Sequence, residues 1–408
     1  MNDGASSAGS DAASCPLDGL RVLDLAGPIG AYCTKLLADL GADVIKVEPP
    51  GGDPMRRLPP LVGDENEAAG SAVFASYHAN KRGVTLEVSR HDALAVLGAL
   101  GADADVVVAS PTRRAPVAGF DRDACILQWA APDAIVASIT PFGLVGPLRD
   151  LRATPLVSFA MGGGMHWAGH RDGPPLAAPG QLAWDEAGIH AAFGIVSALF
   201  ARDRLGGQTL DFAVHDLAAS KDFLIERFDV GAINEWGRSV EIGIPPSGRW
   251  ECRDGPLRIS AHQSHHWEAF LAMLDHPDEL SEPSLADARL RREIFDGLVE
   301  VIAGLVKDRS RYELFEKGQA VGLPCAPEND PGDFVRDEQP LARDLFAELG
   351  AAGERLVRVP WRWCHSTPPM VRLCRPAPKL GQHNREVYVE GIGFTNELLD
   401  SWRGSGLV

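Results

Sequence analysis

The sequence predicts an α/β protein built around a parallel sheet. Three observations support this: strand-like apolar runs alternate with helical patterns, the links between them are short, and turns rich in Gly and Pro separate them. The first unit shows all three, with strand patterns at Leu20–Leu25 and Asp43–Val47 on either side of a helical pattern at Tyr32–Leu40. Short links between strand, helix and strand make a βαβ unit, whose two strands run parallel.

The alternation continues through the first half of the chain. Further strands are predicted over 83–88, 104–109, 134–139 and 209–214, and helices over 92–100 and 186–202. This order is typical of a doubly wound sheet with helices on its faces. The long helix carries four large apolar residues on one face: Ile189, Phe193, Val196 and Phe200.

From about residue 220 the pattern is that of a smaller α+β region. The stretches 250–252 and 257–260 flank Arg253-Asp254-Gly255-Pro256, which predicts a hairpin. Helices are predicted over 266–274, 290–306 and 311–319. After Pro331 the chain is rich in Pro, and a last helix is predicted over 396–403.

Composition excludes several classes of protein. The 56 acidic and 39 basic residues leave a net charge of -17, which disfavours nucleic acid and anionic membranes as partners. The seven cysteines are scattered, which indicates reduced thiols and a cytoplasmic protein. Residues 1–16 lack the pattern of a signal peptide, so we expect a disordered tail. No apolar run reaches the roughly 20 residues of a membrane span.

Several motifs point to ligand chemistry without defining it. The turn Gly27–Cys33 offers G-x-x-G and not the G-x-G-x-x-G of dinucleotide sites, so it is either a tight turn or a ligand-facing loop. The histidines at 262, 265 and 266 match no zinc spacing, and we expect no metal site. Basic residues occur in three adjacent pairs: Arg56-Arg57, Lys81-Arg82 and Arg113-Arg114. Each pair taken singly is typical of a solvated surface, whereas the pairs together could bind a polyphosphate.

Asp185 has two interpretations. It directly precedes the predicted long helix, where an Asp commonly caps free backbone N–H groups, and spacing alone favours this role. It also follows Trp184, and a carboxylate in a partly apolar setting can act as a nucleophile toward an activated acyl group.

The chain resembles the class III coenzyme A transferases, the family of formyl-CoA transferase, the CaiB and BaiF proteins and 2-methylacyl-CoA racemase. The most specific match is LLADLGADVIKVEPPGGDP, which ends at Pro54. Further blocks follow in order: NKRGVTL at 80–86, ASITPFGLVGP at 137–147, GPPLAAPGQLAWDEAG at 173–188 and GQHNREVYVEGIG at 381–393. The resemblance runs from about residue 17 to the end.

The resemblance implies an architecture and a reaction. It implies a large Rossmann-like domain made of 17–220 and 331–408, a small domain over 221–330, and an interlocked homodimer. The family's catalytic Asp matches Asp185, which would carry CoA between carboxylic acids through an acyl anhydride and an aspartyl-CoA thioester. CoA thioesters are then substrates, and no tightly bound cofactor is expected.

The resemblance also implies CoA contacts in four blocks. They are Ile29, Gly30 and Ala31; Pro49; His78, Asn80, Lys81 and Arg82; and Thr140, Phe142 and Gly143. Lys81 or Arg82 would contact a phosphate, whereas Gly30 and Gly143 could simply make turns. Many relatives carry an acidic-Asn-Phe-Arg-Pro-Gly stretch where this chain has Ala109–Arg114, and Arg113 or Arg114 could provide the substitute contact.

Two other functions stay open. Racemases of the family use a His and a Glu besides the Asp, and the matching positions here hold Thr154 and Gln263, neither of which can shuttle a proton. This disfavours a 2-methylacyl-CoA racemase. The other alternative is one subunit of a heteromeric transferase, since some family members pair with a related chain.

Overall fold

The computed structural model describes residues 15–62, 70–112, 116–167, 169, 173–219, 244–350 and 356–408. They belong to two compact units. The first comprises the described parts of Met1–Met165, Ala177–Val230 and Ala342–Val408, and the second those of His166–Leu176 and Gly231–Leu341. The first unit is therefore built from both ends of the chain, and the chain returns to it at Ala342 and not at 331.

The start of the described chain differs from the expected tail. Residues 1–14 of the predicted tail 1–16 lie outside the described residues. Cys15 is buried, and its N–H donates to the Asp18 carboxylate at 2.6 Å. The described chain therefore includes two residues that we assigned to the tail, Cys15 and Pro16.

The first unit is organised by a six-stranded parallel sheet of order β10-β9-β6-β1-β2-β5. Its strands are β1 (Arg21–Leu25), β2 (Asp43–Glu48), β5 (Arg82–Thr85), β6 (Val106–Ala109), β9 (Ile135–Thr140) and β10 (Gln208–Ala213). If the six strands are numbered 1 to 6 along the chain and the sheet is read from β5 to β10, the order is 3-2-1-4-5-6, which is that of doubly wound nucleotide-binding sheets. The direction of winding reverses between β1 and β6, and such sheets bind ligands at the carboxyl ends of the strands there.

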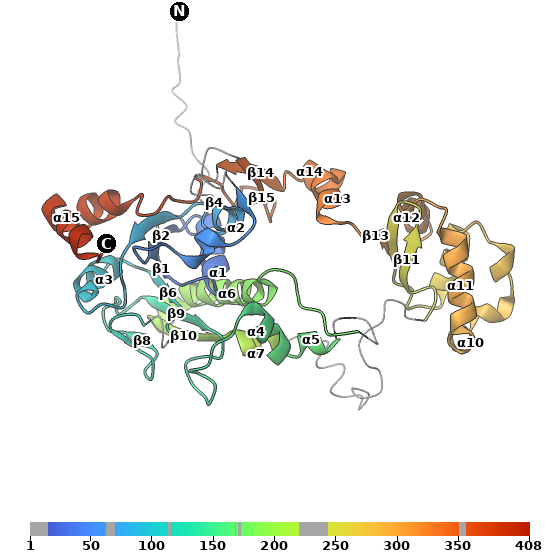
Figure 1. Ribbon diagram of the computed structural model, residues 1–408, viewed down its shortest axis with the longest axis horizontal. Helices are drawn as coiled ribbons and strands as arrows, with labels where there is room; N and C mark the ends of the chain where they lie inside the picture. Colours follow the sequence, from blue (N-terminus) through green and yellow to red (C-terminus); the bar gives the residue numbers. More distant parts are fainter. Residues whose placement is uncertain are drawn as a thin grey trace, which may run out of the picture. The chain divides into compact units, whose positions relative to one another are not determined.

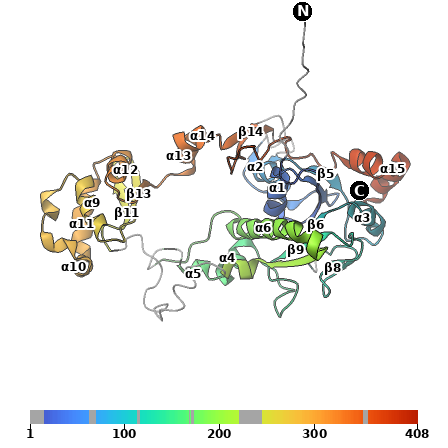
Figure 2. The same ribbon diagram turned by 180° about the vertical axis from the view of Figure 1, so that it is seen from behind.

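Alternating side chains place a core on each face of the sheet. On one face, Val22 and Val44 pack with α1 (Ala31–Asp39) and α6 (Leu182–Leu205). On the other face, Leu23 and Ile45 pack with α3 (Ala93–Gly101) and with α15 (Asn396–Ser405). The segments α3 and α15 lie close together in both views (Figure 1 and Figure 2). A sheet buried on both faces explains why its strands are apolar throughout.

The C-terminal segment also covers the β5 edge of the sheet. The Gly83 N–H donates to His383 Nδ1 and the Thr85 N–H donates to Asn384 Oδ1, both at 2.9 Å. Tyr388, in the π-helix η6 (Arg385–Gly391), donates its hydroxyl proton to the Thr85 carbonyl. These bonds satisfy an edge strand that would otherwise expose unpaired backbone groups.

Shorter elements complete the first unit, and the second unit is α+β. The shorter elements are η1 (Pro54–Arg57), β3 (Leu61–Val62), β4 (Gly70–Ser71), α2 (Ala72–Tyr77), β7 (Phe120–Asp121), β8 (Ile126–Leu127), α4 (Pro155–Met161), α7 (Val214–Ala219), β14 (Phe346–Gly350) and β15 (Leu356–Pro360). The second unit holds β11 (Gly248–Cys252), β12 (Gly255–Ile259), β13 (Cys325–Pro327), α9 (His265–Met273), η3 (Asp278–Leu280), η4 (Pro283–Ala286), α10 (Ala288–Glu293), α11 (Phe295–Val306), α12 (Arg311–Ala320), α13 (Pro331–Arg336) and α14 (Glu338–Ala342). The short helix α5 (Gly164–Trp167) crosses the boundary between the units.

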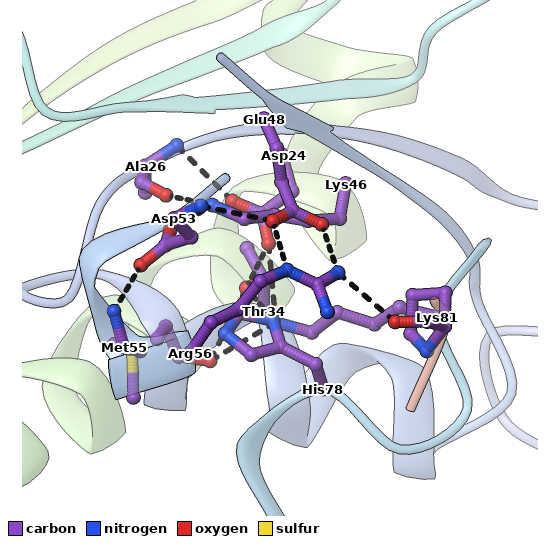
Figure 3. A network of polar contacts seen from close by, with 12 residues as sticks. Asp24, Ala26, Thr34, Lys46, Glu48, Asp53, Met55, Arg56, His78 and Lys81 are labelled. Atoms are coloured by element: carbon purple, nitrogen blue, oxygen red, sulfur yellow. Dashed lines mark hydrogen bonds and ion pairs between the residues drawn. The ribbon is translucent and has the colours of Figure 1, made fainter. Parts of the chain in front are cut away.

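A buried ammonium group joins three elements of the first unit. Lys81 is fully buried, and its Nζ lies 3.1 Å from Asp24 of β1, 2.7 Å from Thr34 Oγ1 and 3.2 Å from the Ala31 carbonyl of α1 (Figure 3). It also lies 3.2 Å from Nδ1 of His78, the C-cap residue of α2. Burial and the nearby cations lower the pKa of His78 well below its ordinary value, so the imidazole is neutral. The contact needs a neutral ring, because Lys81 can only donate.

Two further ion pairs hold the loop after β2. Lys46 Nζ lies 3.0 Å from Asp53, and it also donates to the Ala26 carbonyl in the loop after β1. Arg56 donates two parallel bonds to Glu48, at 2.7 and 2.6 Å (Figure 3). Bidentate pairing of this kind fixes direction as well as distance. The loops after β1 and β2 are therefore tied to one another.

Helices α1 and α6 pack unusually closely. A Cβ added to Gly188 would lie 2.9 Å from the Cys33 backbone nitrogen and 3.0 Å from Tyr32 Cβ. The face of α6 toward the sheet is made of small residues with one larger one: Ala183, Ala187, Gly188, Ala191, Ala192, Ile195 and Ala198. Three of the four large apolar residues predicted on one face of this helix lie on its outer side, where Ile189 is 50%, Phe193 75% and Phe200 94% exposed, whereas Val196 packs against the core.

We predict that Gly188→Ala destabilises the protein by about 1–3 kcal/mol, because the added methyl group collides with backbone that cannot rotate away. Gly98→Ala in α3 is the matched control. A Cβ there meets only Trp129 Cβ at 4.0 Å, so helix propensity should make this change neutral or stabilising by up to about 1 kcal/mol. Urea unfolding measures both. Equal effects of the two substitutions would contradict close packing at Gly188.

We predict that Lys81→Met lowers the free energy of unfolding by about 3–5 kcal/mol, because it leaves Asp24 as a buried charge without its principal partner. The control is Arg90→Ala, which removes an exposed pair with Asp92 and an exposed bond to the Ser405 carbonyl, and it should change the free energy of unfolding far less than Lys81→Met. Urea unfolding again gives the comparison. A Lys81→Met protein as stable as the wild type would show that the ammonium holds nothing together.

Candidate functional site

Asp185 lies in the first turn of the longest helix in the described chain. Helix α6 begins at Leu182, four residues earlier than predicted, so Asp185 is inside the helix and its N–H donates to the Gln181 carbonyl at 3.0 Å. The residue at the cap position is Gln181, whose side chain makes no capping bond. The N-cap interpretation of Asp185 is therefore wrong, and its carboxylate is free for another role.

The partner of Asp185 is Tyr77. The Tyr77 hydroxyl donates to both carboxylate oxygens, at 2.8 Å to Oδ1 and 2.9 Å to Oδ2. Tyr77 is the last residue of α2, and its ring stacks at a tilt against Tyr32 of α1, with the centroids 5.4 Å apart. Sequence reasoning missed Tyr77; the available signal was its position three residues before the family-like block that begins at Asn80.

The surroundings of Asp185 shift its pKa upward without neutralising it at pH 7. Burial raises the pKa of this carboxyl to about 6; the Tyr77 hydrogen bond lowers it, and Glu186 adds to the rise. Burial, followed by the charge of Asp185, raises the pKa of Tyr77, which keeps the phenol protonated as a donor. The result is an oriented, partly desolvated carboxylate, which is what nucleophilic attack by a carboxyl group needs.

A cavity of about 430 Å³ lies at the carboxyl ends of the strands. It is lined by residues that follow β1, β2, β5, β6 and β9, and by Trp184, the neighbour of Asp185. The lining residues are Leu25–Ile29, Lys46, Val47, Pro49, Asp53, Pro54, Leu86–Ser89, Ser110, Thr112, Pro116, Val117, Pro141, Ala153 and Trp184. The loops after β1 and β6 both contribute, so the cavity occupies the point where the winding of the sheet reverses.

Two polar atoms from residues that line this cavity have no partner among the described residues. They are the Trp184 indole Nε1 and the Ser110 hydroxyl oxygen, both buried. A buried polar atom normally has a hydrogen-bond partner, so each is available to a ligand group in the cavity. Lys46, by contrast, is engaged by Asp53 and Ala26. No cluster of metal-ligating side chains occurs in the part of the chain that the structure describes.

The predicted CoA contacts divide into two groups by position. Ile29 and Pro49 line the cavity. Gly30 and Ala31 follow Ile29 directly at the start of α1, and a Cβ on Gly30 would lie 2.5 Å from Ala26 Cβ, so this glycine is needed for the tight turn. Thr140, Phe142 and Gly143 flank Pro141, which lines the cavity, although they do not line it themselves. Arg113 lies outside the described residues.

The block before β5 does not reach the cavity. Lys81 is fully buried on Asp24, and Arg82 is paired with Asp43 and Glu386 at the amino end of β5. Asn80 donates to Asp39 and to the Arg372 carbonyl, both at 2.8 Å. The prediction that Lys81 or Arg82 contacts a phosphate is corrected: both cations neutralise carboxylates within the fold. His78 likewise serves the Lys81 contact described above.

Comparison with known proteins gives the family. The model of CoA-transferase family III matches residues 17–384. A succinyl-CoA:mesaconate CoA-transferase of Haloarcula hispanica is 31% identical, covering 94% of this chain and 99% of the relative. A succinyl-CoA–L-malate CoA-transferase beta subunit of Chloroflexus aurantiacus is 29% identical over 96% of this chain and 98% of its own length.

The fold agrees with this match. The crystal structure of a CaiB/BaiF family protein from Brucella suis superposes with a TM-score of 0.77 at 26% identity, covering 92% of this chain and 99% of that one. None of the described helices is long and apolar enough to cross a membrane. The match to the family model and the identity to the Haloarcula relative together show that the chain belongs to CoA-transferase family III.

Proposed function

We propose that the protein transfers coenzyme A from an acyl-CoA thioester to a carboxylic acid, with Asp185 as the covalent carrier. The observation that carries the proposal is the geometry of Asp185: a carboxylate in the first turn of α6, oriented by Tyr77 and adjacent to Trp184 in the cavity wall. The acyl-CoA would occupy the cavity, along Ile29 and Pro49. Arg113 follows the lining residue Thr112 and is proposed as a phosphate contact.

The reaction proceeds in two symmetrical halves. A carboxylate oxygen of Asp185 attacks the thioester carbonyl, the C–S bond breaks, and an acyl-aspartyl anhydride and CoA thiolate form. The thiolate then attacks Cγ of Asp185, and the donor acid leaves as its carboxylate. The acceptor carboxylate attacks Cγ of the resulting aspartyl-CoA thioester, CoA leaves as its thiolate, and a second anhydride forms between Asp185 and the acceptor. The thiolate finally attacks the acceptor acyl carbonyl of this anhydride, which forms the new CoA thioester and releases the Asp185 carboxylate.

Each intermediate in this sequence is an activated acyl group, so water must be kept away from it. The half-buried position of Asp185 beside Tyr77 and Trp184 limits the access of water. The relatives from Haloarcula hispanica and Chloroflexus aurantiacus are named for succinyl-CoA, and we propose succinyl-CoA as the first donor to test. Free carboxylic acids, screened by the mass of the new CoA ester, identify the acceptor.

The described residues at the two racemase positions do not favour racemisation. Thr154, at the position of the racemase His, caps α4 by accepting the Val157 N–H at 3.3 Å. Gln263, at the position of the Glu, has an amide side chain and cannot take up a proton. Exchange of the substrate α-hydrogen with deuterated water, in the absence of any acid, would indicate a racemase instead.

We predict that the wild-type protein exchanges isotope-labelled succinate into succinyl-CoA without any second acid, because the first half-reaction is reversible. Asp185→Asn should abolish this exchange, since an amide cannot form the anhydride. Glu186→Gln, which alters the neighbouring carboxylate, is the control and should retain it. Mass spectrometry of the CoA ester measures the exchange. Undiminished exchange in Asp185→Asn would remove Asp185 from the mechanism.

We propose further that a second copy of the chain covers the outer face of α6, here defined as Ile189, Phe193 and Phe200. These side chains are 50%, 75% and 94% exposed, and together they form an apolar strip along one helix. Exposed apolar patches of this kind commonly mark interfaces between proteins. A related chain is the alternative partner, because the relative from Chloroflexus aurantiacus is a named subunit.

We predict that the purified chain sediments at twice its own mass and that the double substitution Phe193→Glu with Phe200→Glu converts it to a monomer. Charges on this face would have to be desolvated at the interface, which is costly. The control is Leu356→Glu, also at an exposed apolar position, on β15. Analytical ultracentrifugation measures the mass. A monomeric wild type that pairs only with a related chain would support the heteromeric alternative.

A further inference from the structure

The proposed mechanism places negative charge on an atom that the structure already shows in contact with a donor. When thiolate or acceptor attacks the aspartyl group, the carbon attacked is Cγ of Asp185. The oxygen that takes up the charge in the tetrahedral intermediate is then a carboxyl oxygen of Asp185 itself. A donor that stabilises this oxyanion must therefore reach Oδ1 or Oδ2.

We propose that Tyr77 is a catalytic residue of the transfer, whose hydroxyl stabilises the oxyanion that forms on Asp185 in the two steps at Cγ. This inference rests on the proposed function. In the first of these steps the S–Cγ bond forms, the bond from Cγ to the anhydride oxygen breaks, and the donor acid leaves as its carboxylate. In the second the acceptor oxygen adds to Cγ and CoA leaves as its thiolate. The Tyr77 proton stays on the phenol throughout.

The distances fit this role. Effective oxyanion donors lie about 2.7–3.1 Å from the oxygen that becomes charged. Tyr77 Oη lies 2.8 Å from Oδ1 and 2.9 Å from Oδ2. Because the hydroxyl bridges both oxygens, either one can become the bridging atom of the anhydride while the other keeps its donor. The interaction is therefore in place before charge develops.

Among the described donors next to Asp185, the Trp184 indole Nε1 has no partner and is available to a ligand in the cavity, whereas the neighbouring backbone donors are engaged. The backbone N–H groups of Trp184 and Asp185 both donate to the Gln181 carbonyl, at 2.8 and 3.0 Å. The ammonium groups of Lys81 and Lys46 are held by Asp24 and Asp53. Within the described chain, the hydrogen bonds that reach the Asp185 carboxylate come from Tyr77.

The position of Tyr77 is rigidly determined. Its neighbour His78 is the C-cap of α2. The His78 N–H donates to the Phe74 carbonyl at 3.0 Å, and the His78 ring contacts Lys81. Tyr32 packs against the Tyr77 ring from α1. A donor fixed by the fold does not need to reorganise when the oxyanion forms, and this is the main source of its effect on rate.

Tyr77→Phe tests the proposal with succinyl-CoA as the probe. The ring and its packing remain, so the fold should persist, which a thermal unfolding curve verifies. Removing one oxyanion donor typically lowers the rate by about 10²–10³-fold, and we expect that loss in succinate exchange. Tyr312→Phe, at an exposed tyrosine of α12 in the second unit, is the control for loss of a phenol hydroxyl and should retain exchange.

A single-turnover experiment separates catalysis from mere support of the fold. The first attack occurs at the succinyl carbonyl and releases CoA thiolate, whereas succinate leaves only after attack at Cγ. In Tyr77→Phe the thiol should therefore accumulate after rapid mixing, detected with a thiol reagent upon quenching. If Tyr77 only positions Asp185, the first attack slows and no thiol accumulates, which overturns the proposal.

The pH profile provides a second readout. The groups facing Asp185 are Tyr77 from α2, Tyr32 from α1 and Glu186 on α6. The Tyr77 hydrogen bond lowers the pKa of Asp185, so its loss should raise that pKa above about 6 and move the acidic limb of kcat/KM to higher pH. Exchange at the wild-type rate in Tyr77→Phe would refute the inference, whereas absence of exchange in the wild type would refute the proposed function itself.

Discussion

The candidate site depends on one buried charge, the ammonium group of Lys81. It contacts Asp24 of β1, Thr34 of α1 and the His78 ring at the end of α2, and so holds three elements in one geometry. Tyr77 directly precedes His78, so the same contacts determine where its hydroxyl lies. A buried ammonium is tolerated only with full pairing, and each partner is therefore constrained by the others.

Close packing of α6 on α1 is the second constraint on the geometry of the site. Small residues let α6 approach α1 closely, with Gly188 against Tyr32 and Cys33. Helix α1 is thus common to both arrangements: Lys81 ties Tyr77 to it, and Gly188 brings Asp185 to it. The hydrogen bond between Tyr77 and Asp185, residues 108 positions apart, follows from these two contacts.

The sheet was predictable from sequence because its signals are local. The strands predicted at Leu20–Leu25 and Asp43–Val47 agree with β1 and β2 to within one residue at each end. Long-range pairing was not predictable: a basic pair such as Lys81-Arg82 has the same sequence pattern whether it is solvated or buried on carboxylates.

The predicted helix over 290–306 divides at Ile294 into α10 and α11. The sequence pattern grouped four large apolar residues of α6 on one face. Close packing on α1 instead requires alanine and glycine on the buried face, and it leaves Ile189, Phe193 and Phe200 exposed.

The most direct test of the account is the mass of the Asp185 peptide after turnover. The protein is mixed with succinyl-CoA, quenched with hydroxylamine and digested. The account predicts a hydroxamate on Asp185, formed from the anhydride or the aspartyl-CoA thioester, and its absence when succinyl-CoA is replaced by free CoA. Turnover with an unmodified Asp185 peptide, or with the label on another residue, would contradict covalent transfer through Asp185.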